Sequence, residues 1–584
     1  MKCYFVPPAA QPSDPGDGDG GSGIASLPLS LLARHGARIL DPVAVPVAQG
    51  WPAPRSTVYR ARTLLVPYRL QQEPFLSAVN DVLRGVGMRL VPVPPPSQLA
   101  DYQQLAALPG VAVLVADPQR RAPVVVDAWT ALTALRDAVG EQDDATPGQE
   151  TSRAHGGAVL AAADVRQISL EHLLVGALIT GTPEVDGNPE VDGNAVIAPY
   201  LSATGDSRIP VEVYADPPPR RTDGQCKERY GRRPVIAVLD TGVRAHPWLG
   251  VTRAAAAGGG YHTTADGSVR VDRGIQHAIL VNDSIAAAAG DLAGALIKDP
   301  WDTPVTADPL VGEIEVALGH GTFIAGIFRQ AVPDATVLSI RIMRSDDTVY
   351  EGDLILALKL LAARVARAQD PADPKPELMI DAISLSLGYF NESFSDVAYT
   401  SGLAALIGTL LDMGVLVVAA AGNNSTSRPF YPAAFAAQPR PTGTLSLVSV
   451  GALNPNSTRA LFSNGGRWVS AWASGVMVVS TFPDDVNGSL KSAQEVPARP
   501  QAGPGGHHGP PRTRESLDPD DFRGGFAAWN GTSFSAPALA AWVVGALLDG
   551  ARDDPATLTL ADTAQAATVN RALHALRRRG WEGG

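Results

Sequence analysis

The sequence predicts an α/β fold, a mostly parallel sheet with helices on both faces, preceded by a smaller α+β N-terminal region. Two observations support this prediction. After about residue 233, short aliphatic runs alternate with longer helical segments, which is typical of parallel strands that are covered on both faces. Before that point, residues 58–94 have a strand–helix–strand pattern. At 584 residues, the chain is also longer than one typical domain.

The composition bounds the class of protein. A hydrophobic content of 45% with 18% charged residues is ordinary for a globular protein. The net charge of −12, with no basic block beyond Arg577–Arg579, argues against nucleic-acid binding. The N-terminus has no apolar signal segment, and no run of about 18 apolar residues occurs. We therefore expect a cytoplasmic protein without a membrane segment.

Only two cysteines are present, Cys3 and Cys226. This number excludes a zinc site built from cysteines and argues against a fold held together by a disulfide framework. The sequence leaves open a single disulfide bond between the two residues.

The N-terminal part divides by composition into three segments. Residues 1–57, rich in Gly, Pro, Asp and Ala, are predicted to be mostly disordered. Residues 58–214 are predicted to form the α+β region, and residues 215–232, dense in Pro, Arg and Gly, a linker. The tandem PEVDGN repeat at 183–194 indicates a loop, because a calcium loop needs a longer ligand pattern. The strands and helices expected before the linker are TVYRARTLLVPYRL, EPFLSAVNDVLRGVG, MRLVPV, GVAVLVADP and a strand plus helix in APVVVDAWTALTALRDAV.

Residues 233–584 are predicted to form the larger domain. A flexible insertion is expected at about 484–523, where Gly, Pro and His are frequent. The alternating strands and helices expected around it are VIAVLD, ATVLSIRIM, DLILALKLLAARVARA, MIDAISLSLG, SGLAALIGTLLDMG, VLVVAAAGN and LSLVSVGAL.

Four polar residues stand at ends of these elements. Asp240 ends the run VIAVLD, where open α/β sheets place catalytic groups. His320 lies between two glycines in GHGTFIAG, and Asn423 ends VLVVAAAGN. Ser533 follows a glycine turn in NGTSFSAP, at the start of an apolar helix. Each residue alone also has a structural explanation, as a turn cap or a hydrogen-bonded core residue.

Taken together, these motifs in this order resemble the subtilisin-like serine proteases, the subtilase or peptidase S8 family. The resemblance covers roughly residues 233–567 and implies a subtilisin-like fold and serine endopeptidase activity. It implies that Ser533 is the nucleophile, His320 its base and Asp240 the residue that orients His320. Asn423 and the backbone N–H of Ser533 would form the oxyanion hole. His320 also distinguishes the chain from sedolisins, which use an acidic base.

The resemblance further implies a substrate site. Ser386, Leu387 and Gly388 would pair with an extended substrate backbone, and Phe430 would lie near the floor of the pocket for the residue before the cleaved bond. A bulky ring there disfavours large side chains. No cofactor is required for the chemistry and no metal ligands are assigned, although structural calcium, whose loop is not located, stays open.

The expected partners are a protein or peptide substrate and a regulatory partner of the N-terminal region, with neither nucleic acid nor membrane. Residues 58–94 faintly resemble a cleavable subtilase prodomain, and Arg220–Arg221 and the GRRP segment are candidate processing sites. The alternative is a permanent regulatory domain. Two other functions stay open. One is a dedicated processing protease or peptide transferase that acts on one cellular peptide, and the other is a pseudoprotease that binds partners with a silent or blocked site.

Overall fold

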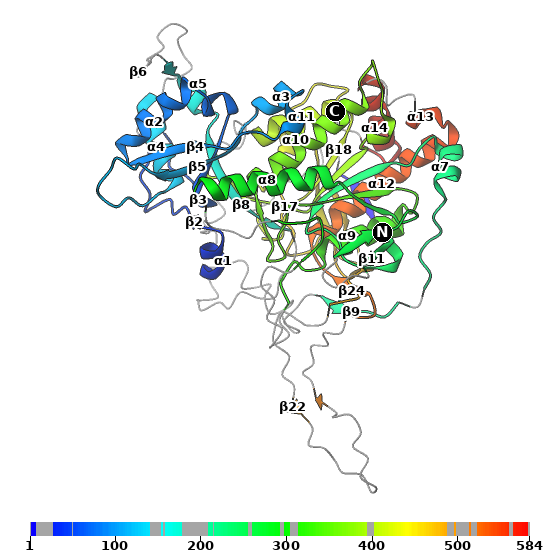
Figure 1. The fold of residues 1–584 in the computed structure, drawn as a ribbon. Helices are drawn as coiled ribbons and strands as arrows, with labels where there is room; N and C mark the ends of the chain where they lie inside the picture. The colour runs from blue at the N-terminus through cyan, green and yellow to red at the C-terminus, as the bar shows by residue number, and fades with distance from the viewer. Residues whose placement is uncertain are drawn as a thin grey trace.

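The computed structural model describes residues 2–6, 27–48, 51–139, 153–155, 158–177, 208–213, 215–254, 260–291, 297–303, 314–393, 402–486, 496–497, 513–514, 522–559 and 565–581. These residues form a large α/β unit and a smaller α+β unit that packs beside it, drawn in blue at the left of Figure 1. The predicted fold class is therefore confirmed.

A sheet of eight strands, in the order β1-β20-β19-β18-β16-β10-β14-β13, is the centre of the large unit. All neighbours are parallel except β1, which runs antiparallel to β20. The aliphatic runs form these strands because parallel strands are buried on both faces. Their bounds are β1 (Cys3–Phe5), β10 (Val235–Asp240), β13 (Val269–Val271), β14 (Thr336–Arg341), β16 (Ala382–Leu385), β18 (Leu416–Ala420), β19 (Val448–Leu453) and β20 (Ala471–Ser474).

Helices cover both faces of this sheet (Figure 1). On one face, α9 (His320–Ala331) packs against α12 (Thr532–Asp553), and on the other lie α8 (Arg273–Ala289), α10 (Glu351–Ala368) and α11 (Gly402–Asp412). Among the helices described, α12 is long and apolar enough to cross a membrane, but 78% of its most apolar window is buried inside the fold. It therefore has the character of a core helix.

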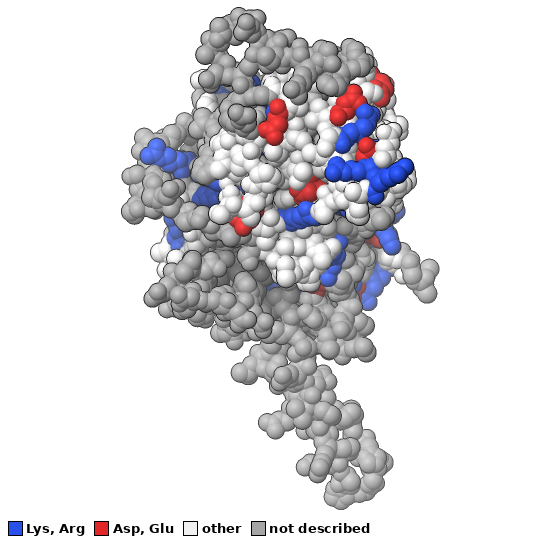
Figure 2. All heavy atoms as spheres, turned by 90° about the vertical axis from the view of Figure 1, so that its left-hand side faces the viewer, with Lys and Arg blue, Asp and Glu red and all other residues white. Residues whose placement is uncertain are grey.

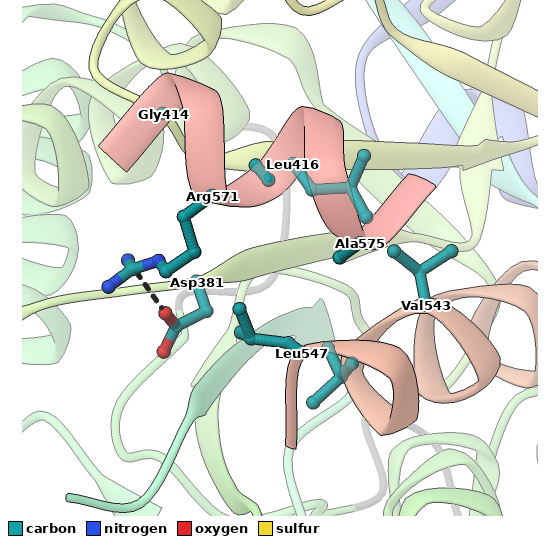
Figure 3. A pocket seen from close by; sticks show the side chains of 9 residues that line it. Asp381, Gly414, Leu416, Val543, Leu547, Arg571 and Ala575 are labelled. Atoms are coloured by element: carbon teal, nitrogen blue, oxygen red, sulfur yellow. Dashed lines mark hydrogen bonds and ion pairs between the residues drawn. The ribbon is translucent and has the colours of Figure 1, made fainter. Parts of the chain in front are cut away.

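The C-terminal helix α14 (Gln565–Arg578) is held on the large unit by an ion pair. Arg571 donates to Asp381 at 3.0 Å, and Arg232 donates to both oxygens of the same carboxylate. The small apolar pocket beside this pair lies between α12 and α14 (Figure 3). Its α12 residues begin at Val543, ten positions after Ser533, so the pocket belongs to the packing of the C-terminal helix and not to the predicted catalytic residues.

The small unit is an antiparallel sheet in the order β8-β3-β5-β4, with α2 (Phe75–Gly85) and α4 (Ala128–Val139) on one face. Along β5, Ala112 and Leu114 pack toward these helices, whereas Val111 and Val113 join the core of the large unit. Both faces of the sheet are thus buried, the second one against α8 and α10. The strands are β3 (Val58–Val66), β4 (Met88–Pro92), β5 (Gly110–Ala116) and β8 (Ser169–Gly176), and β2 (Ala37–Ile39) pairs with β3.

The remaining regular elements are short. They are α1 (Leu29–Arg34), α3 (Gln103–Ala107), β6 (Arg153–His155), β7 (Ala158–Leu160), α5 (Ala162–Val165), β9 (Ile209–Pro210), α7 (Asp223–Tyr230), β11 (Val251–Arg253), β12 (Tyr261–Thr263), β15 (Thr348–Tyr350), β17 (Leu387–Gly388), β21 (Val478–Thr481), β22 (Val496–Pro497), β23 (Thr513–Arg514), β24 (Phe526–Trp529) and α13 (Ala556–Thr559). On the face of the molecule seen in Figure 2, basic and acidic side chains are interspersed.

Three segments differ from the sequence-based expectation. Residues 2–6 and 27–48 were expected to be mostly disordered, yet they contain β1, α1 and β2. A strand of three residues is too short to show a periodic pattern. Strand β1 is ordered by its pairing with β20, and β2 by its pairing with β3. The expected strand in APVVV is absent, because residues 121–127 have no regular structure. The predictions for residues 12–23, for the repeat at 183–194 and for most of 484–523 concern residues outside the described ranges.

The predicted linker also contains structure. Its second half forms α7, which Thr222 and Gln225 start with a capping box, and Cys226 and Tyr230 of this helix are buried. Before it, β9 pairs with β24 of the large unit, so the large unit already includes residues 209–210. Both cysteines are free thiols, which answers the question of a bridge.

Candidate active site

Asp240 and His320 are in direct contact at the carboxyl end of the central sheet. Asp240 is the last residue of β10, and His320 is the first residue of α9. His320 Nδ1 donates to Asp240 Oδ1 over 2.8 Å, and both side chains are buried. Because Nδ1 carries the proton in this arrangement, Nε2 is left as an acceptor, and it has no hydrogen-bond partner. A neutral imidazole held in this way can accept a proton at Nε2.

A buried carboxylate that sequence reasoning missed holds the start of α9. Asp302 Oδ2 accepts the N–H of Gly319 at 2.7 Å and the hydroxyl of Thr241 at 3.0 Å. Burial raises the pKa of Asp302 to about 6 despite the opposing charges of two arginines. The hydroxyl of Thr241 in turn accepts the N–H of Gly321 at 3.0 Å. These bonds tie the first turn of α9 to the turn after β10.

Position 321 must be a glycine because the start of α9 lies directly against the backbone of Gly242. A Cβ there would lie 2.1 Å from the carbonyl oxygen of Gly242, which is backbone and cannot turn away. The glycine therefore lets α9 begin against the end of β10 and brings Asp240 within reach of His320.

Ser533 lies in the first turn of α12 and is fully buried. Its Oγ donates to the carbonyl of Ser386 at 3.4 Å, and the hydroxyl of Ser386 donates back to the carbonyl of Ser533 at 2.9 Å. No hydrogen bond joins Ser533 to His320 among the described contacts. The His320 ring packs against aromatic residues on either side of Ser533 in the sequence: its centroid lies 5.6 Å from that of Trp529 and 5.4 Å from that of Phe534.

Asn423 follows β18 by three residues and faces the start of α12. Its Oδ1 accepts the N–H of Thr532 at 3.0 Å and the hydroxyl of Thr532 at 2.8 Å. These two donors orient the amide, so Nδ2 points away from them, and Nδ2 is buried without a hydrogen-bond partner. An unpartnered N–H donor beside Ser533 is suited to bind a developing oxyanion.

The predicted substrate-pairing residues are occupied by the chain's own β8. Gly176 pairs with Leu387 and Val175 with Gly388, and the N–H of Ala177 donates to the carbonyl of Ser386 at 2.9 Å. On its other side, the same end of β8 pairs with β15. The carbonyl of Ala177 accepts the backbone N–H of Ser533 at 2.9 Å. The resemblance to subtilases implied a pairing surface at residues 386–388, but it did not identify the chain's own β8 as the occupant.

Phe430 is buried between two of these segments. A Cβ on Gly388 would lie 2.4 Å from its ring, and one on Gly422 would lie 2.9 Å from it. The ring thus fills the space between β17 and the end of β18. The role of Phe430 at the floor of a substrate pocket stays a prediction.

The residues described contain no group of three or more His, Cys, Asp or Glu side chains that could hold a metal ion. No structural calcium site is therefore assigned within them.

A parallel α/β sheet with an aspartate–histidine pair at its carboxyl end, and a serine and an asparagine beside the start of a core helix, is the arrangement of a subtilisin-type serine peptidase. The family model of the subtilase family matches residues 231–581. The chain belongs to the subtilase family.

The curated relatives are similar over parts of their length. Subtilisin-like protease 3 of Pseudogymnoascus destructans is 30% identical over 28% of this chain and 36% of its own length. The thermophilic serine proteinase of Bacillus sp. strain AK1 is 28% identical over 33% of this chain and 42% of its own length. Thermitase of Thermoactinomyces vulgaris is 25% identical over 36% of this chain and 67% of its own length. The chain thus spans less than half of the first two relatives.

Proposed function

We propose that the protein is a serine endopeptidase that hydrolyses peptide bonds through Asp240, His320 and Ser533, with Asn423 in the oxyanion hole. One observation carries this proposal. The carbonyl of Ala177, at the end of an extended segment, accepts the backbone N–H of Ser533 at 2.9 Å. A peptide carbonyl thus accepts a hydrogen bond from the backbone N–H of the proposed nucleophile, the same donor that would bind the oxyanion.

The proposed steps follow from the donors and acceptors at the site. Ser533 Oγ turns from the Ser386 carbonyl toward His320 Nε2, gives up its proton there and attacks the carbonyl carbon. Asp240 stabilises the imidazolium that forms, through the bond to Nδ1. The oxyanion is bound by the N–H of Ser533 and the free Nδ2 of Asn423. His320 then protonates the leaving amine, and water hydrolyses the acyl-enzyme by the same route.

The N-terminal region is proposed to act as an internal ligand of this site. The end of β8 is paired on both sides, with β17 and β15, so it fills the surface on which an external substrate would pair. In this position it excludes other peptides, and its bond between Ala177 and Leu178 is the one that Ser533 would attack. Processing at Arg220–Arg221 is less favoured, because Arg220 donates to the carbonyls of Pro333 and Ala335 and Arg221 pairs with Asp334.

Self-cleavage tests this proposal. We expect the purified full chain to be cut after Ala177 on incubation, as read by intact mass, and then to react with a fluorophosphonate probe at Ser533. The alternative, a pseudoprotease with a blocked site, has the same contacts but predicts an uncut chain. A chain that stays intact and also fails to react with the probe after mild urea has displaced the N-terminal region would support the pseudoprotease.

A buried histidine joins the two units and makes their docking depend on pH. His172 of β8 donates to Glu351 at 2.6 Å and to Glu392 at 2.8 Å, and its ring stacks on Tyr389. Burial lowers the pKa of His172, but the two carboxylates outweigh it and raise this pKa to about 10. Burial raises the pKa of Glu392, but the charge and hydrogen bond of His172, together with the charge of Arg136, outweigh it and lower this pKa to about 2.

The sign of the pH dependence follows from these shifts. The pKa of docked His172 is above its free value of 6.5, so its contribution to docking is complete below pH 6.5 and is lost as the pH rises toward 10. Glu392 contributes above its free value of 4.5, and this contribution is lost as the pH falls toward 2. The pKa of the other interface histidine, His35, is lowered, mainly by burial, so it titrates below this upper window.

We therefore expect the urea midpoint for release of the N-terminal region, measured in the inert Ser533→Ala chain, to fall between pH 6.5 and pH 10 relative to that of the same chain carrying His172→Gln. The His172→Gln variant should show a much flatter curve over the same range. Equal slopes for the two chains would remove His172 as the cause.

A further inference from the structure

Gly176, the residue before Ala177, occupies a subsite that is formed mainly by one aspartate. Its N–H donates to the backbone carbonyl of Asp347 at 3.3 Å and to the side-chain Oδ1 of Asp347 at 3.1 Å. Asp347 lies in the turn between β14 and β15 and has a φ of 73°. An aspartate in this left-handed conformation is less stable than a glycine would be, and such residues concentrate at functional sites. The side chain that Asp347 adds at this turn is directed at the bound segment.

The space around Gly176 leaves no room for a side chain. A Cβ at this position would lie 2.2 Å from Asp347 Oδ1, 3.2 Å from Asp347 Cγ and 3.2 Å from Cε of Met343. Met343 is fully buried and closes the same side. The carboxylate can make room only by turning away, and it would then lose its bond to the N–H of Gly176. A residue other than glycine at position 176 is therefore destabilised in two ways: its Cβ overlaps with Asp347, or the hydrogen bond between its N–H and Asp347 Oδ1 is lost.

The electrostatics agree with a subsite built for an uncharged backbone. Burial raises the pKa of the Asp347 carboxyl well above its usual value, the neighbouring Asp346 raises it further, and the bond from the N–H of Gly176 lowers it. The bound backbone thus supplies a donor to this carboxyl. Proline would supply no N–H at the same position.

Resting on the proposed function, we propose that Asp347, together with Met343, makes the enzyme selective for glycine at the position before the P1 residue, the residue whose carbonyl is attacked. With Phe430 filling the neighbouring pocket, the sequence bound in the structure, Leu174-Val175-Gly176-Ala177, is then a model of the substrate class: an extended segment that ends in glycine and a small residue. Asp347 acts here on substrate choice and takes no part in proton transfer.

The test combines a glycine replacement with its compensating change in the full chain. Gly176→Ala should slow cleavage after Ala177 by about 10- to 100-fold, the usual effect of overpacking a filled site. Asp347→Gly removes the overlapping atoms, so the double variant Gly176→Ala/Asp347→Gly should recover a rate close to that of Asp347→Gly alone. Gly85→Ala is the matched control, since a Cβ there meets nothing within 4 Å.

A second readout does not depend on activity. In the inert Ser533→Ala chain, hydrogen exchange of the amides of Ala177 and Gly388 reports whether the end of β8 is docked. Gly176→Ala should speed this exchange, and adding Asp347→Gly should restore protection. If the wild-type chain is neither cleaved nor labelled by the fluorophosphonate probe after mild urea, but this exchange pattern appears, the proposed function fails and the glycine subsite stands.

Three results would overturn the glycine subsite. One is normal cleavage and normal protection in Gly176→Ala. Another is a defect in Gly176→Ala that Asp347→Gly does not relieve, which would assign the defect to β8 itself. The third is cleavage of Gly176→Lys as fast as that of the wild-type chain, which would make Asp347 a selector of basic residues.

Discussion

Replacing Ser533 with alanine is expected to abolish peptide hydrolysis and cleavage after Ala177, with kcat lower by on the order of 10⁶. Among the residues described at the site, Ser533 alone has both a hydroxyl in the first turn of α12 and a backbone N–H bonded to the Ala177 carbonyl, so no other hydroxyl can replace it. The fold should be retained, because the Ser533 side chain makes a single long hydrogen bond of 3.4 Å. The measurements are intact mass after incubation, fluorophosphonate labelling and circular dichroism.

Ser535→Ala is the matched control for this experiment. Ser535 is also a buried serine of α12, but its hydroxyl donates to the carbonyl of Ala473 at 3.1 Å and takes no part in the proposed steps. This variant should lose some stability and keep the catalytic rate. Hydrolysis that persists in Ser533→Ala at the wild-type rate would remove Ser533 from the mechanism.

Replacing Asn423 with alanine is expected to lower kcat by about 10²–10³ with little change in KM, the usual effect of losing one oxyanion donor. The expectation rests on the free Nδ2, which the bonds from Thr532 to Oδ1 hold in a fixed orientation. Because the donor acts on charge that develops only in the transition state, substrate binding should change little. Steady-state kinetics of the released catalytic form on a peptide ending in Gly-Ala would measure both constants.

The neighbouring Asn424 provides the control for that measurement. It is the same residue type in the same turn, and it is exposed. Asn424→Ala should leave kcat unchanged. A loss in Asn423→Ala that appears only in KM would assign Asn423 to substrate binding and contradict its proposed role.

Much of the large unit could be predicted because its signals are local. The aliphatic runs at β10, β14, β16, β18 and β19 are continuous, which indicates strands buried on both faces, and each was placed correctly. The short strand β1 was missed, since its order depends on a partner far along the chain. Cys3 pairs with Ala473, for example, and no pattern within three residues encodes that contact. Helix α7 was missed although its capping box is local, because the Pro, Arg and Gly around it indicated a linker.

The candidate site was predicted in part for the same reason. Gly321 is a local requirement of a helix that starts against the backbone of Gly242, and Gly531, before Ser533, has a positive φ of 155°, so glycines mark both positions in the sequence. Asp302 and Asp347 were not found. Each lies in a turn whose residue types are common, and their roles come from groups that are distant in sequence, Gly319 for the first and Gly176 for the second.

The sequence by itself determined the α/β class and the family, and it singled out Asp240, His320, Asn423 and Ser533 as candidate site residues. Both are possible because strand periodicity and glycine turns are patterns of neighbouring residues. Only the tertiary structure decided which segment lies on residues 386–388. That contact joins Ala177 to Ser386 and Ser533, and it depends on how the two units pack and on the register of β8 against β15 and β17. The apolar run of β8 has the same local sequence pattern whether the strand pairs only with β3 of its own sheet or also with β15 and β17. Packing over long sequence distances therefore decided what occupies the site.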